Sequence, residues 1–462
     1  MKKVYSNINE FTDTISSIDV SDGNFFDLLK TEQIVIKKYN TSYTTVLVLK
    51  ELIAVLKENN SSIIDIVKDN KEEKNLEILV GQTNRTDMEE ILEPNKYIIK
   101  PNGNKLYIVG GSVEAINAAI SILLIKVQSN DLIVTKEIVG NCTKAVSVGE
   151  YSNTITDNFA GTKLDTDLWF NWPKGSNPEI YTKDTGDLIF KNYRDPDNAV
   201  VRDGKLYMGS YLGARTVENG ITTQEVYTTK MESKDGFWFR YGYVEFSAKA
   251  VSGSGLGCTV WLHGDNSKIG NHYCEFDLPE FFGNTKYYRA CPFAWKVTEF
   301  EGERKNRCTW FMGNGIKVRE MHHYSLEDME DFSDAFHTYG LEWDENYYRF
   351  IVDGEIIFDV KYTDMTDADI DGRYFTAEEA INCYQQPCFA VMSIKAGAFW
   401  WSAPTIWPGE KAQYAPDAED IFDKKFDGTD NVLTVDYFTV YQKAGQLSAK
   451  TIEEFYEKDK NN

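Results

Sequence analysis

The chain has 462 residues, which is enough for two sizeable hydrophobic cores. Its formal net charge of −23 argues against nucleic acid, anionic membranes and polyanionic substrates, because each would be repelled. A neutral polysaccharide is not excluded. The aromatic content of 14% suits both the stacking of sugar rings and an all-β core.

The N-terminal segment M-K-K-V-Y-S-N-I-N-E-F contains no apolar run, so it lacks the pattern of a secretory signal. No stretch approaches the ~18 apolar residues that span a membrane. The sequence therefore predicts no membrane association, and a protein that is either cytoplasmic or secreted with its leader missing. We also expect a monomer. The seven cysteines form no C-x-x-C pattern. Cys383 and Cys388 are a candidate pair, but the odd number favours buried free thiols.

Residues 1–145 contain no Trp and alternate strand and helix patterns, which predicts a small α/β domain. The predicted strands are residues 33–38, 76–80, 97–100 and 105–109, and the predicted helices are residues 44–57 and 112–127. The runs E-I-L-V-G-Q-T-N-R and K-L-Y-I-V-G-G-S resemble the accessory α/β domain that precedes the catalytic domain of some hexosaminidases and glucuronidases. The Gly110-Gly111 pair lacks the spacing of a phosphate-binding loop and indicates a tight turn.

Residues 146–445 consist of short strand patterns separated by Gly, Asn and Asp turns, which predicts a β-sandwich or jelly roll. In Y-G-Y-V-E-F-S-A-K, Tyr243 and Glu245 share a face, and in C-T-V-W-L-H-G, Trp261 and His263 share a face. We expect both faces to line a cleft. Residues 326–332 and 376–380 are predicted short helices, and residues 446–462 a polar, partly helical tail.

Three carboxylates lie within the strand pattern Y-C-E-F-D-L-P-E-F-F-G-N of residues 273–284. Alternation places Glu275 and Asp277 on one face and Glu280 on the other. One extra residue, a β-bulge at Pro279, would return Glu280 to the first face, and proline is tolerated at bulges. Three acids on one wall repel each other, and such a set suits a nucleophile paired with a proton donor.

The run E-F-D-L-P-E resembles the E-x-D-x-x-E catalytic signature of glycoside hydrolase family 16. Similar blocks surround it in the family's order: D-N-F-A-G from Asp157, R-Y-G-Y-V-E-F from Arg240, F-H-T-Y-G-L-E-W-D from Phe336, F-I-V-D-G-E from Phe350 and V-D-Y-F-T-V-Y-Q from Val435. The resemblance spans roughly residues 155–443. It implies an all-β jelly-roll catalytic domain and a retaining mechanism.

By this resemblance, Glu275 is the nucleophile and Glu280 the general acid and base, while Asp277 tunes both. A structural acid is the alternative for Asp277. On one bulged face the two glutamates are expected to lie ~5–5.5 Å apart, the separation of retaining enzymes. The family also implies that Trp261 is a sugar platform, with a core aromatic as the alternative.

Other substrate contacts follow from the same resemblance. Arg240 and Asn198 match positions that contact the sugar before the cleavage point. Trp400 and Trp401 fall in an expected cleft-edge loop, where one stacks on substrate and the other packs. Trp295 either extends the binding sites or belongs to the core. A structural calcium ion is a further expectation, held by Asp436 and the carbonyl of Gly204.

The resemblance implies an endo-acting enzyme on a neutral β-linked glycan, first β-1,3- or mixed-linkage glucan. Three departures leave the glycan open: Tyr273 where many members have Trp, G-C-T where W-P-A is familiar, and no His in the strand after the acids. A β-galactan or host β-galactoside is the next expectation. Sulfated galactans are disfavoured because the cleft segments show no Arg/Lys cluster. A transglycosylase and a non-catalytic lectin of the same fold remain alternatives.

Overall fold

The computed structural model describes residues 12–19, 24–59, 64–88, 92–143, 147–176, 178–182, 186–251, 256–265, 272–282, 287–300, 303–310, 324–325, 332–367, 376–396 and 432–461. The chain divides into two compact units. Unit 1 comprises Met1–Thr154, Val352–Glu355 and Tyr441–Ala444, and unit 2 comprises Ile155–Ile351, Ile356–Val440 and Gly445–Asn462. The N-terminal segment of unit 1 therefore ends at Thr154, beyond the predicted boundary at residue 145.

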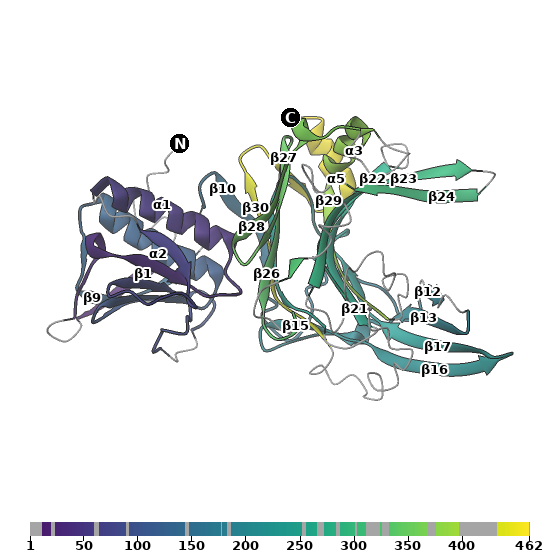
Figure 1. The fold of residues 1–462 in the computed structure, drawn as a ribbon, viewed down its shortest axis with the longest axis horizontal. Coiled ribbons are helices and arrows are strands. Elements are labelled where there is room, and N and C mark those ends of the chain that lie inside the picture. The colour runs from purple at the N-terminus through teal and green to yellow at the C-terminus, as the bar shows by residue number, and fades with distance from the viewer. Residues whose placement is uncertain are drawn as a thin grey trace. The chain divides into compact units, whose positions relative to one another are not determined.

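Unit 1 is a mixed sheet with two helices on one face (Figure 1). The sheet order is β1 (Thr12–Asp19), β9 (Lys136–Cys142), β6 (Lys96–Asn102), β7 (Lys105–Gly110), β5 (Glu77–Val80), β3 (Gln33–Ile36) and β4 (Asp65–Lys68), and the helices are α1 (Tyr43–Asn59) and α2 (Val113–Gln128). The strands β3, β4, β5 and β7 run parallel to one another, and β6 and β9 pair antiparallel. β2 (Phe26–Asp27) and β8 (Ile133–Val134) form a small separate pair. The predicted α/β order of the strands and helices is confirmed.

The turn before α2 explains its glycine pair. Ser112 caps the helix by accepting a hydrogen bond from the backbone N of Ala115 at 3.2 Å. A Cβ on Gly111 would lie 2.0 Å from the carbonyl oxygen of Glu93, so only glycine fits. The glycine is therefore required by a close backbone approach, in agreement with the predicted tight turn.

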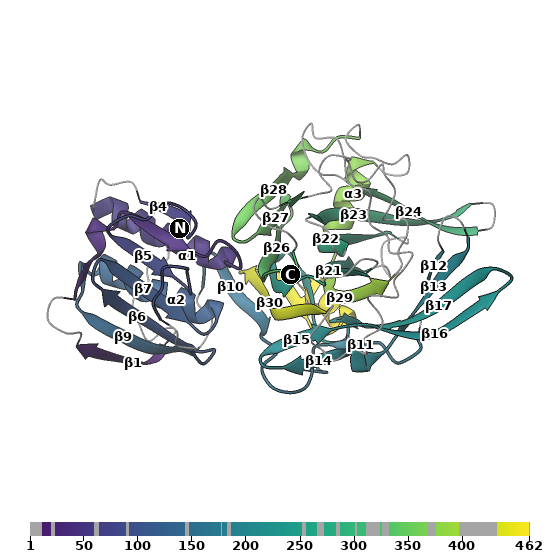
Figure 2. The same ribbon diagram turned by 60° about the horizontal axis from the view of Figure 1, so that its bottom comes forward.

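Unit 2 is a sandwich of two sheets (Figure 2). The β20 sheet has the order β14 (Ala199–Arg202), β15 (Lys205–Met208), β30 (Leu433–Lys443), β20 (Gly242–Lys249), β26 (His337–Trp343), β27 (Tyr347–Val352) and β28 (Glu355–Lys361). The β22 sheet has the order β11 (Phe170–Asn171), β18 (Lys230–Glu232), β29 (Cys388–Ala396), β21 (Leu256–Gly264), β22 (His272–Phe282), β23 (Tyr287–Phe300) and β24 (Glu303–Trp310). Aromatic contacts join the two sheets, among them Phe276 with Trp343 at 5.9 Å between ring centroids. The predicted all-β sandwich is confirmed.

Smaller elements complete unit 2. β12 (Glu179–Thr182), β13 (Leu188–Arg194), β17 (Ile221–Thr228) and β16 (Tyr211–Glu218) form a further sheet. Four short strands add to the larger sheets: β10 (Tyr151–Asp157) pairs with β30, β19 (Trp238–Arg240) with β29, β25 (Tyr324–Ser325) with β23, and β31 (Leu447–Ala449) with β19. α3 (Ala377–Tyr384) begins at a Thr376 capping box, close to the predicted helix at residues 376–380. Most of the predicted helix at residues 326–332 lies outside the described residues. No helix within the described ranges is long and apolar enough to cross a bilayer.

The two faces expected to share a cleft belong to different sheets. β20 pairs with β26, so Gly242 and Phe246 lie on the face of Trp343 and Tyr339, which contacts β22. Glu245 points the opposite way and is fully buried, where it accepts hydrogen bonds from Tyr243 and, at 2.7 Å, from Tyr437. The expectation that the Tyr243–Glu245 face lines the cleft is wrong, because strands adjacent in sequence enter separate sheets.

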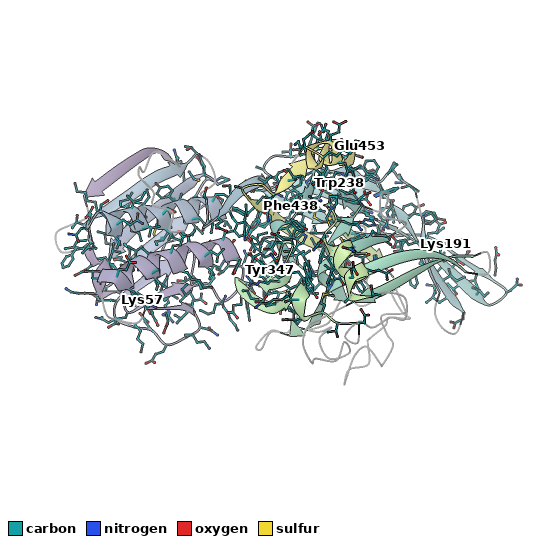
Figure 3. All side chains as sticks on the ribbon, turned by 90° about the horizontal axis from the view of Figure 1, so that it is seen from above. Lys57, Lys191, Trp238, Tyr347, Phe438 and Glu453 are labelled. Atoms are coloured by element: carbon teal, nitrogen blue, oxygen red, sulfur yellow. The ribbon has the colours of Figure 1, made fainter. Side chains whose placement is uncertain are left out.

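Residues 446–462 form more than a polar tail. They contribute β31 and the helix α5 (Ile452–Asp459), whose Phe455 is fully buried against Trp238 and Phe389. Figure 3 labels Trp238 and, on α5, Glu453. The helix covers one end of the β22 sheet on the face that carries Phe389. The partly helical character of the tail is confirmed, but a few apolar residues scattered through a charged segment were too weak a signal to predict this packing.

The described cysteines, Cys142, Cys258, Cys274, Cys383 and Cys388, are free and buried, as the odd count favoured. The sulfur nearest to Cys388 is that of Cys274, at 3.4 Å, rather than that of Cys383. The two sulfurs meet across Gly264 of the intervening strand, which pairs with Cys388. Strands two ladder spacings apart have backbones about 9.6 Å apart, which is too far for a disulfide.

We expect Gly264→Ala to lower the free energy of unfolding by about 1–3 kcal/mol, measured by denaturant titration. A Cβ there would lie 2.7 Å from the sulfur and 2.9 Å from the backbone N of Cys274. The same substitution in a Cys274→Ala background should cost less, because only the backbone contact remains. A Gly264→Ala protein as stable as wild type would contradict this packing.

Candidate active site

A bulge in β22 brings the three acids to one face. On β21, His263, Trp261 and Thr259 pair with Glu275, Asp277 and Glu280 respectively. Two residues of β21 therefore span three of β22, and β23 shows the same shift, so the extra residue lies at Leu278–Pro279. The predicted bulge at Pro279 is confirmed, and the three carboxylates share the face opposite the sheet–sheet core.

Cross-strand pairing arranges this acid face in three rows, because paired residues in a ladder point to the same side. The first row is Lys230, Ser393, Thr259 and Glu280; the second is Glu232, Val391, Trp261 and Asp277; the third is Phe389, His263 and Glu275. The first two rows run from β18, and the third from β29, across β21 to β22. The rows place aromatic and hydroxyl side chains directly beside the acids.

The three carboxylates differ in exposure. Asp277 and Glu280 are 2% and 3% exposed, whereas Glu275 is only half-buried. Glu275 is thus the acid most open to an incoming molecule. Of the predicted trio, the residue assigned as nucleophile is the one that a substrate can reach most directly.

Trp261 lies on the acid face beside Asp277, as predicted, and is half-buried. The ammonium of Lys230 is 5.4 Å from its ring centroid and 5.8 Å from that of Trp172. Its role as a sugar platform stays a prediction. The ring is held at the centre of the acid face by neighbours from three strands, so it is not part of the sheet–sheet core.

A charged cluster that sequence reasoning missed lies on the same face. Glu232 is 4% exposed and accepts from Lys230 at 2.9 Å and Lys234 at 3.0 Å. Although burial opposes ionisation, the two lysines hold the pKa of Glu232 below its ordinary value. The expectation that the cleft segments carry no Arg/Lys cluster is therefore wrong. The lack of such a cluster consequently no longer argues against anionic glycans such as sulfated galactans. The K-M-E-S-K alternation was the available signal.

Two buried hydroxyls lie between this cluster and Glu280. Thr259 and Ser393 are 3% and 1% exposed, and neither hydroxyl has a hydrogen-bond partner among the described residues. They occupy the middle of the first row. Polar groups in such positions gain a partner when a hydroxylated ligand or a water molecule arrives.

Two of the predicted sugar contacts are engaged elsewhere. The guanidinium of Arg240 on β19 donates to Asp459 of α5, with one bond of 3.1 Å. The amide of Asn198 in the short helix η3 (Pro196–Asn198) donates to the carbonyl of Tyr227 at 2.9 Å. Neither residue belongs to the three rows. Arg240 fastens the C-terminal helix, and Asn198 fixes a loop to β17.

The side chains of the remaining predicted tryptophans lie outside the described part of the structure. Trp400 and Trp401 lie outside the described residues. The backbone of Trp295 on β23 pairs with Tyr273 of β22, which places it next to the acid strand. Its side chain is outside the described set. Their roles as substrate contacts stay predictions.

His263 is the closest ring to Glu275 in the third row. It stacks on Tyr273 at 4.7 Å and on Phe389 at 5.1 Å between ring centroids. Burial in this aromatic stack lowers its pKa to about 4, and the charge of Lys230 adds to that effect. The imidazole is therefore neutral near pH 7. The sequence carried the signal, since His263 alternates with Trp261.

The residues expected to hold calcium do not fit such an ion. Asp436 accepts from the ammonium of Lys205 at 2.8 Å, so a lysine supplies the positive charge there. Gly204, with φ of +66°, forms the tight turn before Lys205. Calcium prefers 6–8 oxygen ligands, and the described residues contain no cluster of three or more His, Cys, Asp or Glu side chains that could hold a metal ion.

Comparison with known proteins finds a family match within unit 2. Residues 209–384 match the family described as Glycosyl hydrolases family 16, and the acid motif lies within that range. This match supports a domain of this family in unit 2. Glucan endo-1,3-beta-glucosidase A1 of Niallia circulans is 25% identical over 217 residues, covering 44% of this chain and 28% of that protein.

Two further relatives extend the comparison. Beta-1,3-glucan-binding protein 1 of Manduca sexta is 25% identical over 230 residues, covering 43% of each chain. The chain spans less than half the length of both curated relatives. The laminarinase catalytic domain of Thermotoga maritima MSB8 is 19% identical, with a TM-score of 0.40, over 64% of this chain and all of that one.

The pH dependence of the free energy of unfolding should reflect the lowered pKa of His263. Unfolded, the imidazole binds a proton below about 6.5, but in the fold only below about 4. The unfolded state therefore binds more protons in this window, so His263 destabilises the fold increasingly as the pH falls from 6.5 to 4. Relative to His263→Phe, wild type should lose up to about 3 kcal/mol of unfolding free energy between pH 7 and pH 4. Denaturant titrations at both pH values measure this, and parallel profiles would contradict it.

Metal removal should leave the fold unchanged. We expect the midpoint of thermal unfolding to be the same with EDTA and with added CaCl₂, because Lys205 neutralises Asp436. Differential scanning calorimetry in the two buffers measures it. A midpoint that falls with EDTA and recovers with calcium would show that the lysine yields to a metal ion.

Proposed function

We propose that this protein is a retaining, endo-acting glycoside hydrolase of a neutral β-linked polysaccharide, with β-1,3- or mixed-linkage β-1,3/1,4-glucan as its substrate. The observation that carries the proposal is the bulge in β22, which sets Glu275, Asp277 and Glu280 on one face. The family match over the same strand supports it. The curated names of the relatives, which concern β-1,3-glucan, support the substrate.

The proposed chemistry is a double displacement by the chain's own carboxyl groups. Glu275 attacks the anomeric carbon while the glycosidic C–O bond breaks, and Glu280 gives its proton to the departing oxygen. Glu280, now ionised, takes a proton from a water molecule, whose oxygen displaces Glu275. Net retention at the anomeric carbon follows from the two inversions.

Burial suits the assignment of roles. Glu280 must hold a proton at the start, and its 3% exposure beside Asp277 disfavours a second charge. The more open Glu275 must reach the sugar ring. Asp277, in the row between them, tunes both carboxyls by its charge and by hydrogen bonding.

Three alternatives differ from the proposal in measurable ways. An endo-β-galactosidase would use the same acids on another sugar. A transglycosylase would pass the bound sugar to a second glycan instead of water. A glucan-binding protein has no need of three acids on one strand, so the complete E-x-D-x-x-E set favours an enzyme.

Incubation with laminarin, lichenan, galactan and mucin-type oligosaccharides, followed by product sizing, tests the proposal. We expect wild type to release short oligosaccharides from laminarin or lichenan without products longer than the starting chains. Glu275→Gln and Glu280→Gln should each lower kcat by roughly 10³-fold or more on the cleaved glycan, because each removes a group that forms or breaks a bond. With an activated aryl β-glycoside, azide should restore turnover of a Glu280→Ala variant as the β-glycosyl azide, because azide displaces Glu275 without the help of a base. In a Glu275→Ala variant azide should instead give the α-glycosyl azide, because it attacks the anomeric carbon directly.

Glu342→Gln is the matched control. Glu342 is a buried carboxylate on the outer face of the β20 sheet, bonded to Tyr347 at 2.9 Å. We expect it to keep wild-type turnover even if its unfolding midpoint shifts. Near-normal turnover in either acid-face variant would overturn the catalytic assignment, and galactan cleavage alone would replace the substrate.

A further inference from the structure

His263 is a polar group of the acid face that the proposed reaction does not use. It pairs across the ladder with Glu275, so the two side chains stand next to each other on adjacent strands. Both are half-buried and thus open to the same molecule. The position therefore places a second hydrogen-bonding group beside the carboxylate that attacks the sugar.

The orientation and tautomer of the imidazole are fixed by its neighbours. Tyr273 and Phe389 cover the two faces of the ring, with interplanar angles of 7° and 20°. The Nδ1 atom lies 2.6 Å from the carbonyl oxygen of Gly264. A carbonyl only accepts, so Nδ1 carries the proton and the Nε2 lone pair is an acceptor.

No described residue hydrogen-bonds to Nε2; the one hydrogen bond of this ring within the described part of the chain is that to Gly264. The adjacent group, Glu275, is an acceptor when ionised and cannot donate to it. Nε2 of His263 therefore calls for a donor beyond the described residues. Sugar hydroxyls are neutral donors, whereas a carboxylate or sulfate would be repelled by Glu275.

We propose that Nε2 of His263 accepts a hydrogen bond from a ring hydroxyl of the sugar that Glu275 attacks, which makes His263 a substrate-contacting specificity residue. This inference rests on the proposed function. The chemical group recognised in that binding position is an unsubstituted hydroxyl of the sugar. The aromatic stack keeps the acceptor at a fixed place. A sugar that lacks the hydroxyl leaves Nε2 without a partner in a half-buried site.

The test separates recognition from packing. His263→Phe keeps an aromatic ring between Tyr273 and Phe389 but removes the acceptor. The probes are the aryl β-glycoside of the disaccharide that wild type cleaves, aryl β-laminaribioside for a β-1,3-glucan, and its monodeoxy analogues in the sugar that carries the aryl group. The measured quantity is kcat/KM for each enzyme on each probe.

We expect His263→Phe to lower kcat/KM on the parent probe by roughly 10- to 100-fold. One deoxy analogue should be a poor substrate for wild type by a similar factor, with no further loss in the variant, because the same bond is removed twice. The other analogues should show independent losses. A merely structural role would lower all probes alike and leave every deoxy effect additive.

Failure of the inference and of the proposed function give different results. If wild type cleaves its glycan and His263→Phe is equally active, or all deoxy losses are additive, the inference is overturned and the hydrolase stands. If wild type cleaves no glycan of the panel, the proposed function fails and the inference with it. Circular dichroism and the unfolding midpoint at pH 7 confirm that the variant is folded.

Discussion

The interaction on which the rest depends is the mismatch between β22 and its two neighbours. In a strand without the bulge, the side chain of Glu280 would point to the same face as Phe276. It would then lie among the rings of Trp343 and Tyr348, where an ionised carboxylate is costly. The extra residue at Leu278–Pro279 reverses the side of everything that follows it, so Phe281 enters the core and contacts Tyr339. One inserted residue thus serves the core and the acid face together.

The acid face carries several negative charges close together. A protein of net charge −23 sets three carboxylates beside one another on a single strand, two of them nearly buried. Lys230 brings a positive charge to the same rows and is held between Glu232 and the two indole rings of Trp261 and Trp172. The lysine forms its ion pair with Glu232 and not with the three acids. Its positive charge nevertheless weakens the negative electrostatic potential around them. The hydroxyls of Ser393 and Thr259 fill the gap between.

What the sequence predicted and what it missed have a common physical reason. Local patterns were sufficient for α2, with its Ser112 cap, for the strand that carries Glu275, and for the bulge at Pro279. Which sheet a strand joins depends on pairing between distant segments. β20 and β21 follow one another, yet β20 pairs with β26 while β21 pairs with β22 and β29. The site of Lys230 was missed for the same reason, because β18 reaches the acid face only by pairing with β29.

Two adjacent residues of β21, His263 and Gly264, connect the sheet–sheet core with the acid face. Gly264 faces the core, where the absence of a side chain lets the sulfurs of Cys274 and Cys388 approach each other. Its carbonyl oxygen, on the same residue, accepts the proton of His263 Nδ1 and so sets which nitrogen faces the substrate. A Cβ at residue 264 would press against Cys274, the neighbour of Glu275, and move that carbonyl as well. Packing behind the sheet and recognition in front of it therefore depend on the same residue. The missing side chain of Gly264 relieves the crowding, and its backbone carbonyl binds the Nδ1 proton, which leaves Nε2 as the acceptor.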